Sequence, residues 1–256
     1  MCLDIDSTPH EQRGKKMEGL AWNYKDMWCL DSQVIFDQFG MCWGFDLRSG
    51  NTKSGVGASE MIKTALRGFK FRDEKQVRAD SAYCNQDVIK TCIGLRAEFT
   101  ITANQATTGW RDHIPSITNW EKSTVSEGTE YGSFLWRPSW SDSLRINVVV
   151  KREVVEDEQR DLFDDVYKYY GVVTNMSLFK KSKQELMEHH AKRGNAENFI
   201  REEKYGYDLK HFPCQKMDAN HVFGLIAMVA HNLLRWMSLI DSPTKTKYAK
   251  KWVYIK

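Results

Sequence analysis

The heptapeptide CLDIDST occupies residues 2–8, and apolar and acidic residues alternate within it. The alternation predicts a short strand over residues 2–6, ended by the Ser-Thr-Pro that follows. Successive side chains of a strand point to opposite faces, so Asp4 and Asp6 are expected on one face. Two carboxylates on one face repel each other unless a cation, a partner or solvent lies between them. A solvated edge strand and a binding site both remain open at this point.

The segments that follow alternate between strand and helix patterns. Two apolar stretches meet near Gly40 and predict paired strands. Apolar residues spaced three and four apart then predict a helix, followed by a strand, a helix and a strand. The predicted elements are strands at 27–39 and 41–47, a helix at 57–70, a strand at 76–80, a helix at 85–96 and a strand at 97–102. This order is typical of a mixed α/β sheet flanked by helices.

Strand patterns rich in Val, Tyr and Trp dominate the middle of the chain, and helical patterns return after it. The strands are predicted at 134–140, 144–155 and 166–175, and the helices begin at Ser182 and include 218–240. We interpret the middle as a β-rich insertion between two parts of one α/β core. The expected organisation is a first core part at 1–104, the insertion at 105–177, a second core part at 178–241 and a basic tail at 242–256.

The composition indicates a soluble globular protein that could meet a polyanion. Charged residues make up 28% and aromatic residues 12% of the 256 residues. From residue 177 onward there are 15 Lys and Arg against 8 Asp and Glu, whereas the first 176 residues carry 22 against 26. A basic end joined to a mildly acidic remainder fits nucleic-acid binding along one face.

The cysteines and the apolar runs point to the cytoplasm. The six cysteines show no Cys-x-x-Cys pair, so reduced thiols are expected rather than a zinc site or disulfides. No signal peptide opens the chain. The long apolar run 222–240 contains His231, Asn232 and Arg235, which predicts a buried helix and no membrane span.

Asp80 follows the predicted strand at 76–80 and precedes a predicted helix. Ligands of open α/β sheets gather beyond the carboxyl ends of strands, and Asp6 is expected at such an end too. An aspartate in this position is also a common helix cap. Asp80 is therefore a candidate site residue that needs support from elsewhere in the chain.

One predicted helix carries a carboxylate surrounded by basic side chains. At 100° per residue, one narrow face holds five residues. They are His190, Arg193, Glu197, Arg201 and Lys204. Ordinary Arg–Glu pairing along a helix surface would stabilise the helix by only about 0.2–0.5 kcal/mol, and it remains the alternative to a functional site.

The spacing of Arg193, Glu197 and Lys204 resembles the signature of bacterial cut-and-paste insertion-sequence transposases. In that signature a tyrosine stands where this chain has His190. Further segments resemble the family's first and second aspartate strands, its Arg-x-Gly-Asn turn and its closing helix, in the family's order. They are LDIDST at 3–8, RADSAY at 78–83, LRSGNT at 47–52, DAN at 218–220 and AHNL at 230–233.

The resemblance implies a ribonuclease H-like fold with a β-rich insertion before the last catalytic acid. It implies that Asp6, Asp80 and Glu197 hold two Mg²⁺ ions, for which Mn²⁺ can substitute, and that these ions cleave and transfer DNA strands. His190, Arg193, Arg201 and Lys204 would then hold DNA phosphates. The implied partners are double-stranded DNA, at the element ends and the target, and a second copy of the chain in a synaptic complex near the bacterial nucleoid.

The resemblance also implies an N-terminal domain that recognises the element ends, and this chain begins just before the first aspartate strand. We therefore expect a truncated copy or an isolated catalytic core. The alternatives are a ribonuclease H-like nuclease or resolvase without strand transfer, and a catalytically dead DNA-binding remnant. One tryptophan of the insertion could receive a flipped base, although core packing explains these tryptophans more simply. They are Trp110, Trp120, Trp136 and Trp140.

Overall fold

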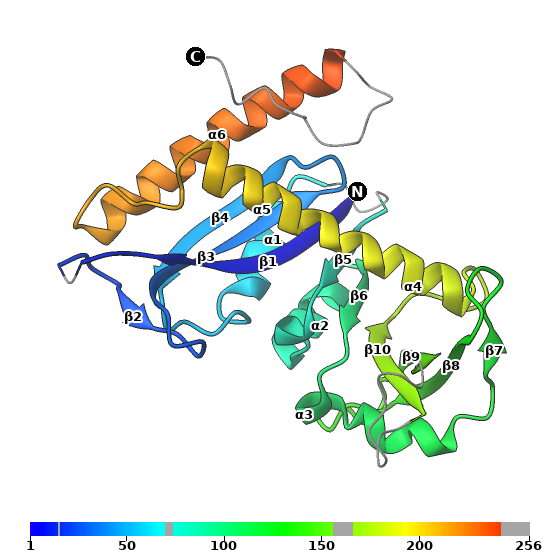
Figure 1. The fold of residues 1–256 in the computed structure, drawn as a ribbon. Helices are drawn as coiled ribbons and strands as arrows, with labels where there is room; N and C mark the ends of the chain where they lie inside the picture. Colours follow the sequence, from blue (N-terminus) through cyan, green and yellow to red (C-terminus); the bar gives the residue numbers. More distant parts are fainter. Residues whose placement is uncertain (15, 70–73, 156–165, 242–256) are drawn as a thin grey trace. The chain divides into compact units, whose positions relative to one another are not determined.

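The computed structural model describes residues 1–14, 16–69, 74–155 and 166–241 (Figure 1). The chain forms two compact units. Unit 1 combines the N-terminal residues 1–75 with the C-terminal residues from Gly194 onward, and unit 2 comprises Gln76–Arg193. The connection between the predicted strands at 144–155 and 166–175 and the predicted basic tail at 242–256 lie outside the described residues.

Unit 1 is built on an antiparallel sheet. Its central strand β3 (Trp28–Asp37) pairs with β1 (Cys2–Glu11), with β4 (Cys42–Ser49) and with the short β2 (Ala21–Trp22). The predicted hairpin near Gly40 is confirmed, and Gly40 has a φ of 82°, which favours glycine.

The predicted end of the first strand is wrong. Strand β1 continues through Pro9 to Glu11, in unbroken register with β3 from the pair Leu3–Asp37 to the pair Glu11–Cys29. Pairing along the length of β3 outweighs the local turn signal of Ser-Thr-Pro, because strand formation depends on neighbours more than on intrinsic preference. Asp6 therefore lies in the middle of a strand and not at its carboxyl end.

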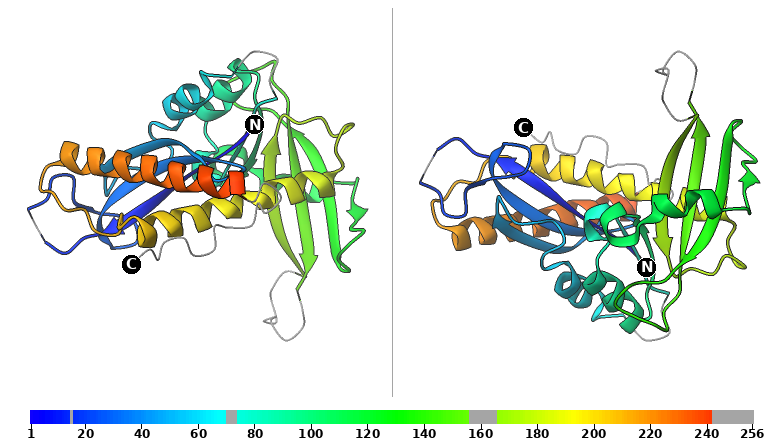
Figure 2. Two further views of the ribbon diagram at one scale, coloured as in Figure 1. Left: turned by 90° about the horizontal axis from the view of Figure 1, so that it is seen from above. Right: turned by 90° about the horizontal axis from the view of Figure 1, so that it is seen from below.

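Helices cover both faces of this sheet (Figure 2). Helix α1 (Ala58–Leu66) lies on one face, and α5 (Asn195–Gly206) and α6 (Met217–Asp241) lie on the other. Apolar side chains of β3, β4, α5 and α6 form one buried cluster. The cluster includes Leu30, Val34, Phe36, Phe45, Leu47, Ala196, Phe199, Ile200, Ala227 and Met228. These residues fix α5 and α6 to the sheet by burying apolar surface.

Helix α6 is only partly the buried helix that the sequence predicts. By length and composition alone it could cross a membrane, which is weak evidence by itself. Its polar residues His231 and Arg235 are buried against the sheet, whereas several of its large apolar side chains are exposed. The helix therefore turns its mixed face inward and an apolar stripe outward.

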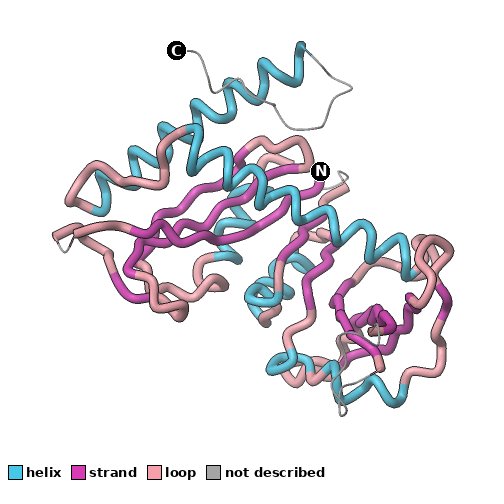
Figure 3. The backbone as a smooth tube through the Cα atoms, viewed as in Figure 1, coloured by secondary structure: helices cyan, strands magenta, loops and turns pink. Residues whose placement is uncertain are grey.

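Unit 2 contains a mixed sheet (Figure 3). Strands β5 (Gln76–Ala79) and β6 (Glu98–Thr102) are parallel and are connected by α2 (Gln86–Gly94). Four further strands continue the sheet from β6 in antiparallel pairs, in the order β10, β9, β8, β7. Their bounds are Tyr167–Thr174, Ile146–Val154, Thr129–Trp136 and Glu121–Lys122.

The connecting segments of unit 2 complete the described structure. Helix α4 (Lys183–Ala191) packs on the sheet and begins with a capping box between Ser182 and Glu185. The remaining short helices are η1 (Ser81–Tyr83), α3 (Gln105–Thr108) and η2 (Trp110–Ser116), and η4 (Lys192–Gly194) leads into unit 1.

The predicted mixed α/β class is confirmed, with sheets flanked by helices. The strands assigned to a β-rich insertion extend the sheet that begins with β5 and β6, because β10 pairs directly with β6. The compact units divide the chain near residues 75 and 193.

Candidate active site

Asp6 lies on the face of β1 that α5 covers. Its register partner Val34 and the partner of Asp4, Phe36, both belong to the apolar cluster with α5. Since alternate residues of a strand share a face, Asp4 and Asp6 project toward this same side. Asp4 is 2% exposed, whereas Asp6 is partly exposed. The backbone N–H of Ser7 donates to Oδ1 of Asp6 at 2.8 Å, which helps to orient the carboxylate.

Glu197 lies in the first turn of α5, on the same side of the unit 1 sheet. Phe199 packs on Phe36 with ring centroids 5.4 Å apart, and Lys204 Nζ donates to the carbonyl of Pro9 at 2.8 Å. These two contacts show that α5 and β1 run in the same direction. Glu197 precedes Lys204 by about 10 Å along a helix axis, and Asp6 precedes Pro9 by about 10 Å along a strand. Glu197 and Asp6 are therefore carried on the same side of the unit 1 sheet, by elements that run in the same direction.

Glu197 shares one stripe of α5 with Arg201 and Lys204, beside the stripe that is buried in the core. Glu197 and Arg201 are exposed, and neither has an ion pair or side-chain hydrogen bond to another residue that the structure describes. Lys204 is half-buried instead, and burial lowers its pKa while nearby Asp31 opposes the shift. The basic residue that is open to a ligand is thus Arg201 rather than Lys204.

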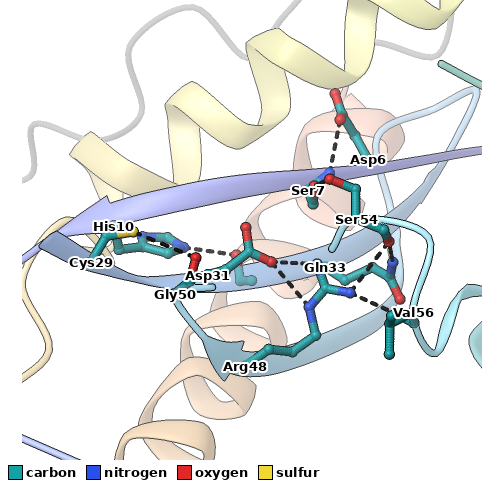
Figure 4. Close-up of polar contacts among 11 residues, drawn as sticks. Asp6, Ser7, His10, Cys29, Asp31, Gln33, Arg48, Gly50, Ser54 and Val56 are labelled. Atoms are coloured by element: carbon teal, nitrogen blue, oxygen red, sulfur yellow. Dashed lines mark hydrogen bonds and ion pairs between the residues drawn. The ribbon is translucent and has the colours of Figure 1, made fainter. Parts of the chain in front are cut away.

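A polar network on the opposite face of unit 1 connects the Asp6 strand to the 50–57 loop (Figure 4). The hydroxyls of Ser7 and Ser54 are 2.8 Å apart, and the carbonyl of Ser54 accepts from Gln33 and from Arg48. Arg48 is buried, forms an ion pair with Asp31 and also donates to the carbonyl of Val56 at 2.8 Å. This arrangement holds the strand that carries Asp6 against the loop.

The sequence indicated one half of this network. The segment 47–52 drew attention to Arg48, but the pattern gave no sign of its partner Asp31, which lies 17 residues earlier on β3. Burial raises the pKa of Asp31 to about 6, although the Arg48 guanidinium opposes that shift. An aspartate within a predicted buried strand is the sequence feature that could have identified Asp31, because a buried carboxylate requires a cation or hydrogen bonds.

Asp80 lies directly after β5 in unit 2, as expected for a strand end. Its side chain accepts from the backbone N–H of Ala82 at 2.9 Å and caps the short helix η1. The capping role is therefore observed, and the side chain remains partly exposed. Oxygen that is not engaged by the cap stays accessible for a ligand, since a carboxylate has about four acceptor positions.

The expected helical face from His190 to Lys204 is wrong in its first half. Helix α4 ends at Ala191, the 3-10 helix η4 covers Lys192–Gly194, and α5 begins at Asn195. Gly194 costs about 1 kcal/mol in a helix interior relative to alanine, and 3-10 turns are common where two helices join. The 100° spacing therefore holds from Glu197 to Lys204 but does not extend back to Arg193.

His190 is an interior residue of unit 2, and the geometry gives no support to a role in phosphate binding. It is 1% exposed. Its Nδ1 lies 3.0 Å from the Thr100 hydroxyl, and its Nε2 lies 3.0 Å from that of Thr102 and 3.1 Å from that of Tyr170. Burial, then the charges of Arg193 and Arg78, lower the pKa of His190 to about 3. The imidazole of His190 is therefore uncharged near neutral pH in the folded chain.

The tryptophans of the middle section are mostly structural. Trp110 and Trp136 are buried, as core packing predicts. The ring of Trp120 is covered by the guanidinium of Arg152 at 4.1 Å, and that of Trp140 by Lys90 Nζ at 5.1 Å. Stacking of a base on any of them would first require a change in these contacts.

The cysteines are free thiols, as expected. Burial raises the pKa of Cys84 to about 11 and that of Cys92 to about 12, so these thiols stay protonated at neutral pH. Neither is suited to nucleophilic chemistry, which needs the thiolate.

The donor chemistry of the three acids fits a hard divalent cation, because all three supply carboxylate oxygen. Asp6 and Glu197 lie on one side of the sheet in unit 1, and Asp80 belongs to unit 2. Within the described part of the chain, no group of three or more His, Cys, Asp or Glu residues lies close enough to hold a metal ion.

Comparison with known proteins identifies the family. Residues 1–252 match the sequence profile described as Transposase DDE domain group 1. No curated protein matches the chain. The match spans almost the whole sequence, including all three acids and both units. The chain therefore belongs to the DDE transposase domain family, whose members are metal-dependent polynucleotidyl transferases acting on DNA.

Proposed function

We propose that this chain is the catalytic core of a bacterial insertion-sequence transposase, which cleaves the ends of a mobile element and joins them to target DNA. The observation that carries the proposal is the placement of Asp6 and Glu197 in unit 1. The strand β1 and the helix α5 run in the same direction, and their packing on one side of the sheet supports the pairing of these two acids. Asp80, at the end of β5, is the third acid of the proposal.

The proposal includes a ribonuclease H-like core interrupted by a β-rich insertion at 105–177. Two features support it: an antiparallel β1–β3–β4 meander in unit 1, and a parallel β5–α2–β6 segment in unit 2. A first core part at 1–104 and a second at 178–241 remain the proposed division, with 242–256 as a basic tail.

Asp6, Asp80 and Glu197 would hold two Mg²⁺ ions, or Mn²⁺ in their place. When bound, such ions polarise a scissile phosphodiester and stabilise the leaving oxygen. Ser7 N–H orients the Asp6 carboxylate, and the Ala82 N–H does the same for Asp80. Arg201 has no partner among the described residues and is exposed, so it is suited to hold a phosphate beside Glu197. Arg193 is a second phosphate candidate, and Lys204 a weaker one.

The test is a strand-transfer assay. The substrates are a labelled oligonucleotide, taken from DNA that flanks the gene and ending in a 3′-hydroxyl, and a supercoiled target plasmid with Mg²⁺ or Mn²⁺. The chain is assayed alone and fused to the end-recognition domain of an intact relative. We expect joined products from the wild type, and their loss in Asp6→Asn, Asp80→Asn and Glu197→Gln, each of which removes one negative charge. DNA binding should be largely retained in all three.

Asp4→Asn is the matched control, because Asp4 lies on the same face of the same strand but is buried. It should retain joining, provided that its unfolding midpoint is unchanged. Nicking without joined products would favour a nuclease or resolvase instead. Binding without any metal-dependent cleavage would favour a DNA-binding remnant.

A further inference from the structure

Helix α6 presents a continuous apolar stripe to solvent. Eight large apolar side chains of this helix are between 43% and 63% exposed. They are Val222, Leu225, Ile226, Val229, Leu233, Trp236, Met237 and Ile240. Together they expose on the order of several hundred Å², the size at which an apolar patch marks an interaction site on a soluble protein.

The spacing of the stripe is that of a coiled-coil seam. Six of its members follow one another at intervals of four, three, four, three and four residues. They are Val222, Ile226, Val229, Leu233, Trp236 and Ile240. A 3.5-residue repeat keeps a seam facing a second helix along the whole length of both. The pattern therefore indicates a long helix as the occupant, rather than a flat surface or an extended segment.

The opposite side of α6 is anchored, so the stripe cannot turn inward. Arg235 Nε donates to the carbonyl of Phe39 at 2.6 Å, and His231 Nε2 lies 2.8 Å from the carbonyl of Gly40. Asn232 makes two hydrogen bonds to the backbone of Cys42. At Gly224 the helix approaches Phe45 so closely that an added Cβ would lie 2.3 Å from its ring. These contacts set the rotation of α6 about its axis.

We infer that α6 pairs through this stripe with α6 of a second copy of the chain, in antiparallel orientation. The seam covers 19 residues, and every other helix that the structure describes has 12 residues or fewer. A second α6 matches the seam in length and in register, and a two-fold pairing closes on itself without leaving a free seam.

The antiparallel orientation follows from size and from dipoles. About a two-fold axis at position 231, Val229 faces Leu233 of the second copy, and Ile226 faces its Trp236. Large and small side chains then alternate across the seam. In a parallel pair, Trp236 would face Trp236 of the second copy. Antiparallel helices also place opposite dipole ends side by side.

The experiment measures the mass of the full chain by sedimentation velocity over a concentration series. We expect a wild-type dimer, and an increase of about tenfold or more in its dissociation constant for Val229→Lys and for Leu233→Glu separately. Both positions are exposed in the single chain, so both variants should remain folded, which their far-ultraviolet circular dichroism checks. Val125→Lys, at an exposed valine in unit 2, should leave the dimer intact.

Mixing the two variants distinguishes the antiparallel seam from other contacts. In the mixed pair, the introduced lysine of one chain would face the introduced glutamate of the other. The unchanged Leu233 of the first chain would face the unchanged Val229 of the second, so dimers should reappear. A monomeric wild type, or dimers unaffected by both substitutions, would overturn the proposal. So would flotation of the wild-type chain with neutral phosphatidylcholine vesicles that both substitutions abolish, because it would assign the stripe to a lipid surface.

Discussion

The two units hold their candidate acids by different physical means. In unit 1, Asp6 lies in the middle of a ten-residue strand. Glu197 lies on a helix that is held against the sheet by apolar packing. In unit 2, Asp80 follows a strand directly and is oriented by a backbone N–H two residues away. The geometry of Asp80 is thus local, whereas that of Asp6 and Glu197 depends on tertiary contacts between distant segments.

The units also differ in how they hold their buried charges. Unit 1 encloses the Asp31–Arg48 ion pair, with Lys204 close to it. The ion pairs described in unit 2 are more exposed on at least one partner, as in Lys183–Glu121. We therefore expect substitutions in the interior of unit 1 to lower both the stability and the activity of the proposed site. Substitutions in the interior of unit 2 should lower stability alone.

The largest effect is expected from removing one partner of the buried ion pair. Arg48→Met leaves Asp31 without its cation, which typically costs about 3–5 kcal/mol for a buried pair. Denaturant unfolding should show the loss. Asp31→Asn should be milder, because the amide oxygen that it introduces can still accept from Arg48. Combining Asp31→Leu with Arg48→Met should recover much of the stability. An Arg48→Met chain as stable as the wild type would contradict a structural role for the pair.

A comparable effect is expected from the packing of α5. Phe199→Ala removes a buried ring that contacts Phe36 and the turn at Gly40, at a cost of about 3–5 kcal/mol. Because α5 carries Glu197, strand transfer should fall more than the folded fraction alone explains. The matched change in unit 2 is Phe99→Ala, also fully buried. Phe99→Ala should lower stability but leave strand transfer per folded molecule unchanged. Equal losses of strand transfer per folded molecule in both variants would contradict the difference between the units.

The next effect concerns acid stability and compares one histidine in each unit. Burial lowers the pKa of His10 in unit 1 and of His190 in unit 2 to about 3. Between that value and the unfolded pKa near 6.5, the unfolded chain binds more protons, so stability falls as the pH falls through this range. Each histidine contributes a slope of up to about 1.4 kcal/mol per pH unit.

Unfolding measured from pH 7 to pH 4.5 checks this expectation. His190→Gln keeps hydrogen-bonding capacity and should flatten the slope, as should His10→Gln, whose histidine lies 2.7 Å from the hydroxyl of Ser32. His211→Gln is the control, because His211 is exposed. If both buried variants kept the full wild-type slope, the histidines would have to be protonated in the folded chain.

The smallest effect distinguishes the two cations of α5. Arg201→Ala should reduce the slope of log binding constant against log salt by about one unit on DNA, as for one lost phosphate contact. Lys204→Ala should reduce it less, because Lys204 is half-buried and donates to Pro9. Lys53 is an exposed lysine of the 50–57 loop, and Lys53→Ala tests whether the loss of any surface charge reduces the salt slope equally. A larger change for Lys204 than for Arg201 would reverse the assignment.

Local signals in the sequence were sufficient for most elements and for the family. Gly40 marked the hairpin because its positive φ suits glycine, and the parallel β5–α2–β6 segment followed from a change in apolar periodicity. The motifs around Asp6, Asp80 and Glu197 carried the family, which the profile match confirms. These features depend on residues close together in the chain, and so they can be read from it.

Only the tertiary structure decided the end of β1, the burial of His190 and the partner of Arg48. Strand β1 runs past Pro9 because β3 offers it a full-length partner, and His190 turns inward because hydroxyls of β6 and β10 surround it. The outward stripe of α6 also depends on distant anchors at residues 39–42. The sequence determined which residues are acidic, apolar or turn-forming, whereas pairing between remote segments determined which of them are buried, because burial depends on neighbours that local patterns do not specify.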